Sequence, residues 1–319
     1  MLQSDNNNVP RGAWLLLFVA LFAVSSAGAV LQSMSEIPPI LRASWRMQGT
    51  ALILLPGFIY QLYFLDREMF NRKDVAIIFL SSCFLAAHFG SWVWSLDHTS
   101  LVHSLLFVTS HPLVVVLLMP ILGSEIRRGH VIGALIGFIG AALTLKDIDA
   151  GGEVTLIGNF FAFIGAVTVV GYLFSGRYLR SERNMPLFIY AFPVTFLSAV
   201  WLTPASLILE STTFSQTIPE IGVFGWFDIS WILWIGYLSL GPGLLGHTGI
   251  NAVLRWFPPL IVSIALLFEP VIGGVIGWLW TGDIYLGAWT IVGGCLMLAG
   301  AMLVKIEEAN EQTTDESPS

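Results

Sequence analysis

Charged side chains are scarce in this sequence: only 11% of its 319 residues are Asp, Glu, Lys or Arg, whereas 55% are hydrophobic. A water-soluble domain needs more polar surface than this composition supplies, so an ordinary soluble protein is excluded. The chain also lacks a basic tract and a nucleic-acid-binding motif, which argues against nucleic acid as a partner. We therefore expect a multi-pass membrane protein in contact with the lipid bilayer.

Cysteine is almost absent as well. Cys83 and Cys295 both lie in apolar stretches, where cysteine behaves as a small hydrophobic residue rather than as a disulfide partner. The histidines at positions 88, 103, 111 and 247 lack the spacing of a metal site, so we predict neither a metal nor another cofactor. A Walker-type phosphate loop is missing too, and direct use of ATP has no support.

The apolar residues fall into ten stretches, and a helix needs about 20 such residues to cross a bilayer core. The stretches lie near 13–31, 40–64, 75–95, 99–121, 130–146, 154–175, 185–209, 229–250, 257–280 and 285–304. With the N-terminus in the cytoplasm, most of the 14 Lys and Arg residues fall in cytoplasmic segments. Because basic residues gather on that side, both termini are predicted to be cytoplasmic.

Two of these stretches are interrupted by proline in corresponding places. His111-Pro112 and Glu269-Pro270 lie 158 residues apart, and in each pair an ionisable residue stands directly before the proline. Each half of the chain then carries five spans, an odd number, so the second half enters the membrane in the opposite orientation. Such inverted repeats, with interrupted helices in equivalent positions, are typical of secondary transporters.

This organisation predicts an all-α membrane protein of ten transmembrane helices in two inverted five-helix repeats. The expected divisions are a cytoplasmic N-terminal tail at 1–12, repeats at 13–150 and 151–305, and an acidic, disordered cytoplasmic tail at 306–319. Glycines spaced by four residues from Gly129 to Gly137 predict close helix packing, within one chain rather than between two chains. Formation of a homodimer is left as an alternative.

The order of several motifs resembles the drug/metabolite transporter superfamily, and within it the EamA-type repeat. In the first half the resemblance rests on Ile37-Pro38-Pro39-Ile40-Leu41-Arg42 and His98-Thr99-Ser100; in the second it rests on Gly158-Asn159, Gly246-His247 and Leu267-Phe268-Glu269-Pro270. It extends over about residues 12–305. The resemblance implies a ten-helix transporter with spans 1–4 and 6–9 around a central cavity and spans 5 and 10 at the periphery. It implies no particular substrate.

Glu269 is the leading candidate for substrate binding or coupling, because an ionisable group at membrane depth is costly and usually functional. Its carboxyl group could exchange a proton or pair with a cationic substrate, and the alternative is a protonated acid bonded to a backbone carbonyl. His111 occupies the related position and could interact with Glu269. The alternative role of His111 is structural: a hydrogen bond to a backbone carbonyl that Pro112 leaves without a partner.

Five further residues are candidates for the same site. Arg42 and Arg46 share one face of the second span, where they could receive a carboxylate or phosphate, or else extend to the lipid headgroups. His88 stands one turn from Trp92, and His247 follows a Gly-Pro-Gly break that could act as a hinge. For His88, Trp92 and His247 a packing role is the alternative.

The predicted function is secondary transport of a small metabolite by alternating access, with proton coupling, exchange and facilitated diffusion all open. We do not expect an enzyme, and the alternatives are an intramembrane transferase that uses Glu and His, or a scaffold or receptor without flux. A plasma membrane or bacterial inner membrane is the expected location, with an organelle membrane as the alternative. The substrate is not determined by the sequence.

Overall fold

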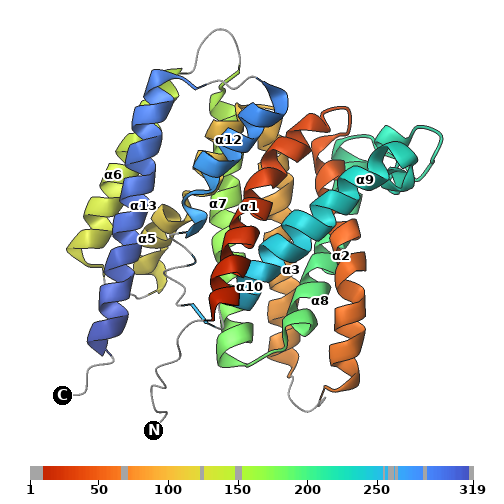
Figure 1. Ribbon diagram of the computed structural model, residues 1–319, viewed down its shortest axis with the longest axis horizontal. Helices are drawn as coiled ribbons and strands as arrows, with labels where there is room; N and C mark the ends of the chain where they lie inside the picture. Colours follow the sequence, from red (N-terminus) through yellow and green to blue (C-terminus); the bar gives the residue numbers. More distant parts are fainter. Residues whose placement is uncertain are drawn as a thin grey trace.

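The computed structural model describes residues 10–65, 71–122, 126–147, 153–253, 256, 257, 262, 265–282 and 286–315. In these residues the regular elements are helices, apart from a single bridge between Thr213 and Gly222. The beginning of α1 and the end of α13 lie at the same end of the molecule (Figure 1). The predicted all-helical class is confirmed for this part of the chain, whereas the predicted boundary between residues 150 and 151 lies outside the described residues.

Most of the α-helices follow one another after a few residues, whereas residues 210–228 separate α8 from α9. The α-helices are α1 (Arg11–Ser33), α2 (Pro39–Tyr63), α3 (Arg72–Leu96), α4 (Leu101–Val108), α5 (His111–Leu122), α6 (Arg128–Thr144), α7 (Leu156–Arg177), α8 (Leu187–Leu209), α9 (Ile229–Leu238), α10 (Gly249–Val253), α12 (Glu269–Thr281) and α13 (Ala288–Asp315). The shorter elements are the 3-10 helices η2 (Leu145–Asp147), η4 (Pro219–Ile221) and η5 (Gly225–Phe227) and the π-helices η3 (Tyr178–Glu182) and η6 (Ser239–Thr248).

Eight helical segments in the described part of the chain are long and apolar enough to cross a membrane. The ten predicted spans include two more, and each of these differs for a local reason. Helix α2 is long enough, but its 25 residues include Arg42, Arg46 and Gln48, which lower its hydropathy. Helix α12 has only 13 residues, because it begins in the middle of the predicted span.

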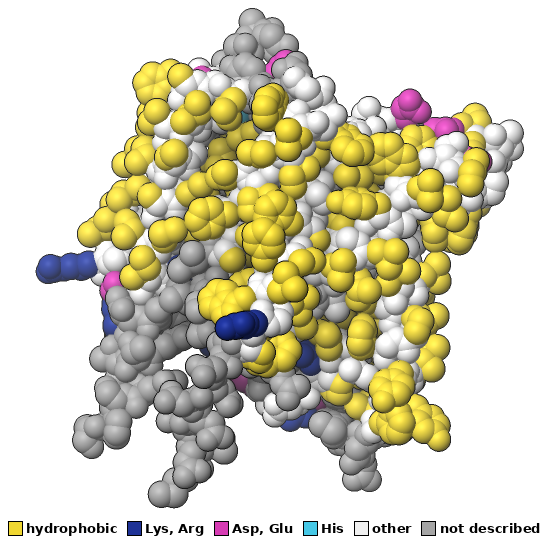
Figure 2. Space-filling view, viewed as in Figure 1, with side chains coloured by type: hydrophobic (Ala, Val, Ile, Leu, Met, Phe, Trp, Pro, Cys, Tyr) yellow, Lys and Arg dark blue, Asp and Glu magenta, His cyan; other side chains and the backbone are white. Residues whose placement is uncertain are grey.

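The outer surface of the helices is apolar. Figure 2 shows hydrophobic side chains over most of one face, with Lys and Arg side chains in its lower part. Leu15, Ile59 and Leu279 are among many large apolar side chains that remain exposed. A soluble protein exposes such residues singly rather than over a whole face, so this surface is suited to lipid.

The two spans with corresponding prolines, Pro112 and Pro270, are interrupted where the sequence predicts. Helix α4 ends at Val108, and after a two-residue turn α5 begins at His111, with Pro112 as its second residue. Helix α12 begins at Glu269, with Pro270 as its second residue. Proline is well tolerated in the first turn of a helix, where its missing N–H group would have no helical partner. His111 and Glu269 are therefore each the first residue of a helix.

Helices α6 and α13 pack along each other at one side of the molecule (Figure 1). A Cβ atom on Gly140 would lie 2.5 Å from the carbonyl oxygen of Gly293, and one on Gly133 would lie 2.7 Å from that of Gly300. An early glycine of α6 thus faces a late glycine of α13, so the two helices run in opposite directions. The prediction that the glycine spacing serves packing within one chain is confirmed here.

The C-terminal segment differs from its prediction. Helix α13 continues through Asp315, so residues 306–315 are helical and the prediction of a disordered tail is wrong for them. The physical reason lies in the composition, since Glu, Ala and Gln dominate from Glu307 to Gln312 and all three favour helix.

Candidate functional site

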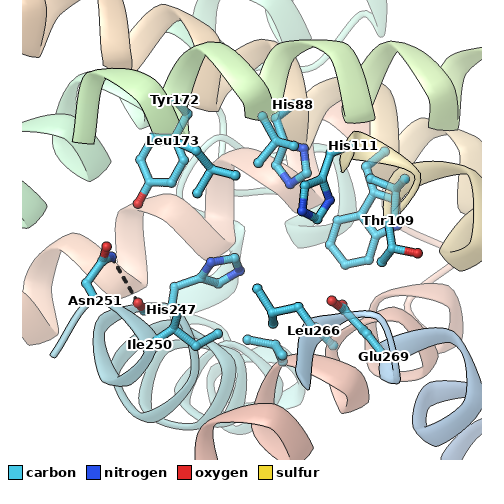
Figure 3. Close-up of a pocket in the computed structure, with 15 residues that line it drawn as sticks. His88, Thr109, His111, Tyr172, Leu173, His247, Ile250, Asn251, Leu266 and Glu269 are labelled. Atoms are coloured by element: carbon cyan, nitrogen blue, oxygen red, sulfur yellow. Dashed lines mark hydrogen bonds between the residues drawn. The ribbon is translucent and has the colours of Figure 1, made fainter. Parts of the chain in front are cut away.

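A cavity lies between helices of both sequence halves. Its ionisable lining residues are His88 from α3, His111 from α5, His247 from η6 and Glu269 from α12. Figure 3 shows the His111 and His247 rings and the Glu269 carboxyl group around one common space. The remaining wall is mostly apolar and aromatic, with Trp92 among its members. A small apolar cavity with a few converging polar groups is the usual form of a ligand site.

Helix α3 holds His88 in a defined orientation. The His88 ring is buried, and its Nδ1 atom lies 2.9 Å from the carbonyl oxygen of Gly165 on α7. Because a carbonyl only accepts, Nδ1 carries the hydrogen, and Nε2 of the neutral ring remains an acceptor. The ring also stacks on Trp92, one helical turn away, with 6.2 Å between ring centroids. Its tautomer and its plane are thus both fixed.

His111 and Glu269 reach the cavity from the N-terminal ends of two helices. The first N–H groups of a helix have no partner within it, and the helix dipole gives this end a partial positive charge. At the first turn of α12 this partial positive charge lies beside the half-buried Glu269 carboxyl group. The N-terminal end of α12 therefore favours negative charge in this part of the cavity.

His247 lies in a widened stretch of helix. The predicted Gly241-Pro242-Gly243 break appears as the π-helix η6, which joins α9 to α10 without interrupting the helical path. Pro242 removes one backbone donor, and π-helical turns are often found at functional sites. The side-chain amide of Asn251 donates to the carbonyl oxygen of His247 at 3.0 Å (Figure 3), which holds this segment at the cavity wall.

Arg46 lines a second, smaller cavity that shares Tyr172, His247 and Asn251 with the first. Its side chain is fully buried, with 0% exposure. The guanidinium carbon lies 4.3 Å from the centre of the Phe89 ring. Within the described part of the chain, none of the three guanidinium nitrogens has a hydrogen-bond partner. Glu269 is close enough to attract Arg46 electrostatically.

Arg42 has a different environment, although it lies one turn before Arg46. It is also fully buried, but its Nη1 atom donates to the carbonyl oxygen of Leu31 at 2.5 Å and its Nη2 atom forms an ion pair with Asp97. Arg42 therefore lies in neither of its predicted settings: its charge is neutralised inside the protein, not at the headgroups and not in the cavity. The two arginines do not form a joint anion site.

The two cavities thus bring together Glu269, His111, His88, Trp92, His247 and Arg46, but not Arg42. Six polar lining residues were missed by sequence reasoning: Thr50, Thr109, Tyr172, Thr195, Thr248 and Asn251. Thr50 follows Arg46 by four residues and Asn251 follows His247 by four, so each shares a helix face with a predicted residue. That spacing could have identified both. Tyr172 has no comparable signal in the sequence.

Membrane-length helices, a lipid-compatible surface and a polar cavity between helices define an integral multi-pass membrane protein. Residues 11–146 match the model of the EamA-like transporter family. The resemblance predicted from motifs is confirmed over this part of the chain. No curated protein sequence matches the chain significantly.

A solved structure described as "Crystal structure of protein" is similar to this one. The TM-score is 0.59 at 18% sequence identity, and the match covers 94% of this chain and 99% of the other. At this identity the similarity shows a shared fold alone. Because it extends over nearly the whole of both chains, the second half of this protein is also part of that fold.

Proposed function

We propose that the protein is a secondary transporter that carries a small metabolite through the cavity by alternating access. One observation carries the proposal: the cavity is walled by ionisable groups from both halves, with His88 and His111 from the first and His247 and Glu269 from the second. A site between two halves opens to one side and then to the other as the halves move against each other. The family match over residues 11–146 supports this reading.

The proposal includes ten spans in two inverted repeats, with both termini in the cytoplasm of a cell bounded by a plasma or bacterial inner membrane. Helix α2 and the span that contains α12 supply the two spans beyond the eight. The equivalent starts of α5 and α12 and the opposite directions of α6 and α13 support inversion. Basic side chains near the end that holds both termini support the orientation (Figure 2).

Glu269 has the central role in this proposal. It is the one carboxyl group among the described residues that line the larger cavity. A carboxyl group at this depth can bind a proton or a positive charge in one state and release it in another, and a glutamine in its place cannot.

The experiment measures uptake of labelled metabolites into liposomes that contain the purified protein. The wild type is expected to take up at least one solute faster than protein-free liposomes do, and Glu269→Gln is expected to lower that initial rate tenfold or more. Glu36→Gln is the matched control, because it makes the same chemical change at an exposed position outside the cavity. We expect it to retain the wild-type rate.

Two results would contradict the proposal. One is that no solute enters faster than into protein-free liposomes, which would favour a scaffold or receptor. The other is equal uptake by Glu269→Gln and the wild type, which would remove Glu269 from the transport site.

A further inference from the structure

The guanidinium group of Arg46 is a buried positive charge without a hydrogen-bond partner among the described residues. It has five N–H donors and 0% exposure, and among the described residues no acceptor is bonded to its nitrogens. A buried charge without hydrogen bonds is destabilising. The attraction of Glu269 offsets part of this cost but supplies no hydrogen bond to the guanidinium nitrogens. The Phe89 ring at 4.3 Å compensates in part through a cation–π contact, but a ring face accepts no directed N–H bonds.

Other unpaired donors accompany Arg46. The hydroxyl group of Thr50, one turn further along α2, has no hydrogen-bond partner among the described residues and lines the same small cavity. The indole N–H group of Trp92, on the wall of the larger cavity, is likewise unpaired in that part of the chain. Buried polar atoms are normally bonded, so a cluster of unpaired donors beside a cavity points to an absent acceptor.

The missing acceptor is expected to carry negative charge. Arginine binds a carboxylate through two parallel N–H···O bonds, a geometry that its planar guanidinium group favours. The N-terminal end of α12 faces the larger cavity and favours the same sign of charge. Three histidines, His88, His111 and His247, also face this space and can form hydrogen bonds with a bound molecule.

The rest of the ligand must suit the larger cavity. Apart from its polar groups, this cavity is walled by aliphatic side chains, including Val24, Val108 and Leu266, and by the Trp92 ring. It adjoins the small cavity through Tyr172, His247 and Asn251, which line both. A molecule with its charged end at Arg46 can therefore extend an apolar body into the larger space.

We propose, on the basis of the transport function above, that the transported substrate is an organic monocarboxylate with an apolar body, and that Arg46 binds its carboxylate group. Thr50 donates a further hydrogen bond to the carboxylate, and the wall around Trp92 receives the body. A carboxylate is preferred to a phosphate because a single guanidinium group is the only fully charged cation among the described residues of the two cavities.

The binding test compares pairs of ligands that differ only in charge. The melting temperature of the purified protein is measured with benzoate and benzamide, with hexanoate and hexanamide, and with inorganic phosphate. A ligand that binds only the folded state raises the melting temperature. We expect at least one carboxylate to raise that of the wild type by several degrees, and its amide and phosphate to leave it unchanged.

Variants connect this shift to Arg46. Arg46→Gln is expected to lose the carboxylate-dependent shift. Arg177→Gln removes a positive charge at an exposed position at the end of α7, and this variant is expected to keep the carboxylate-dependent shift. Arg46→Lys retains the charge without the planar fork, so a shift smaller than that of the wild type is expected. If Arg46→Gln does not fold, the carboxylate-dependent shift of Arg46→Lys is compared with that of the wild type instead.

The proposal is overturned if no carboxylate raises the melting temperature, if an amide or phosphate does so equally well, or if the shift persists undiminished in Arg46→Gln or Arg46→Lys. Uptake into liposomes separates this outcome from failure of the transport function. Carboxylate binding without uptake of any solute would contradict transport and leave the Arg46 site in place. Uptake of uncharged or cationic solutes alone would contradict the Arg46 site and leave transport in place.

Discussion

Arg46→Met is expected to abolish transport while leaving the melting temperature of the ligand-free protein unchanged or higher. The substitution removes a fully buried charge that has no hydrogen-bond partner in the described part of the chain. Burial of such a charge costs several kcal/mol, whereas the lost cation–π contact with Phe89 contributes about 0.5–2 kcal/mol. The methionine side chain fills much of the vacated apolar space.

The measurement combines thermal unfolding of the detergent-purified variant with initial uptake rates in liposomes. If Arg46 instead stabilised the folded protein, Arg46→Met would lower the melting temperature. A melting temperature several degrees below that of the wild type would show that Arg46 has partners in the protein and would remove the main reason to assign it to a ligand.

Arg42→Met, the same substitution one helical turn earlier, is expected to destabilise the protein by roughly 3 kcal/mol. It leaves the carboxylate of Asp97 and the carbonyl oxygen of Leu31 without their partner. It also removes a positive charge close to Glu210, whose carboxylate accepts the N–H groups of Ile40 and Leu41 at 2.6 and 2.9 Å. The loss stays near the lower limit for a buried ion pair, because the Asp97 side chain is 22% exposed.

Thermal unfolding of Arg42→Met and Arg46→Met side by side tests this contrast, since the two variants share the helix, the substitution and the degree of burial. Folded Arg42→Met is expected to retain uptake in liposomes. Equal stability of Arg42→Met and the wild type would contradict the structural assignment of Arg42.

The sequence could not distinguish these two arginines. Their spacing predicts a shared helix face, and to a first approximation they have one, since both side chains are buried. The two arginines differ in the residues that they contact. Arg42 meets Leu31 and Asp97, which precede and follow it by many residues, whereas Arg46 meets the Phe89 ring and a cavity. Partners so distant along the chain depend on how α2 packs, which hydropathy alone does not specify.

Other features could be predicted because they depend on local chemistry. The interruptions at His111-Pro112 and Glu269-Pro270 are favoured by proline, which lacks a backbone N–H group and clashes with the carbonyl of the preceding turn. The packing of α6 depends on its glycines, which permit a backbone approach that any side chain would block. An ionisable residue inside an apolar stretch is equally visible, which is why Glu269 and the buried histidines were found.

Features that depend on neighbouring helices were missed. Tyr172 is one of several aromatic residues in an apolar stretch, and only the packing of α7 against α3 brings it to the cavity. The Gly241-Pro242-Gly243 segment predicts a weak point in a helix, but not that the chain stays helical with π-type turns. The helical continuation of α13 to Asp315 was overlooked because acidic composition was given more weight than helix propensity.

The most direct test of the account is whether the cavity opens to each side of the membrane in turn. Ile250, which lines it, would be replaced by cysteine in a protein whose own Cys83 and Cys295 are serines. A membrane-impermeant thiol reagent is expected to label Ile250→Cys in both right-side-out and inside-out vesicles. Gly12→Cys, at the exposed beginning of α1, is expected to be labelled in only one of the two. Labelling of Ile250→Cys from one side alone, or from neither, would contradict alternating access through this cavity.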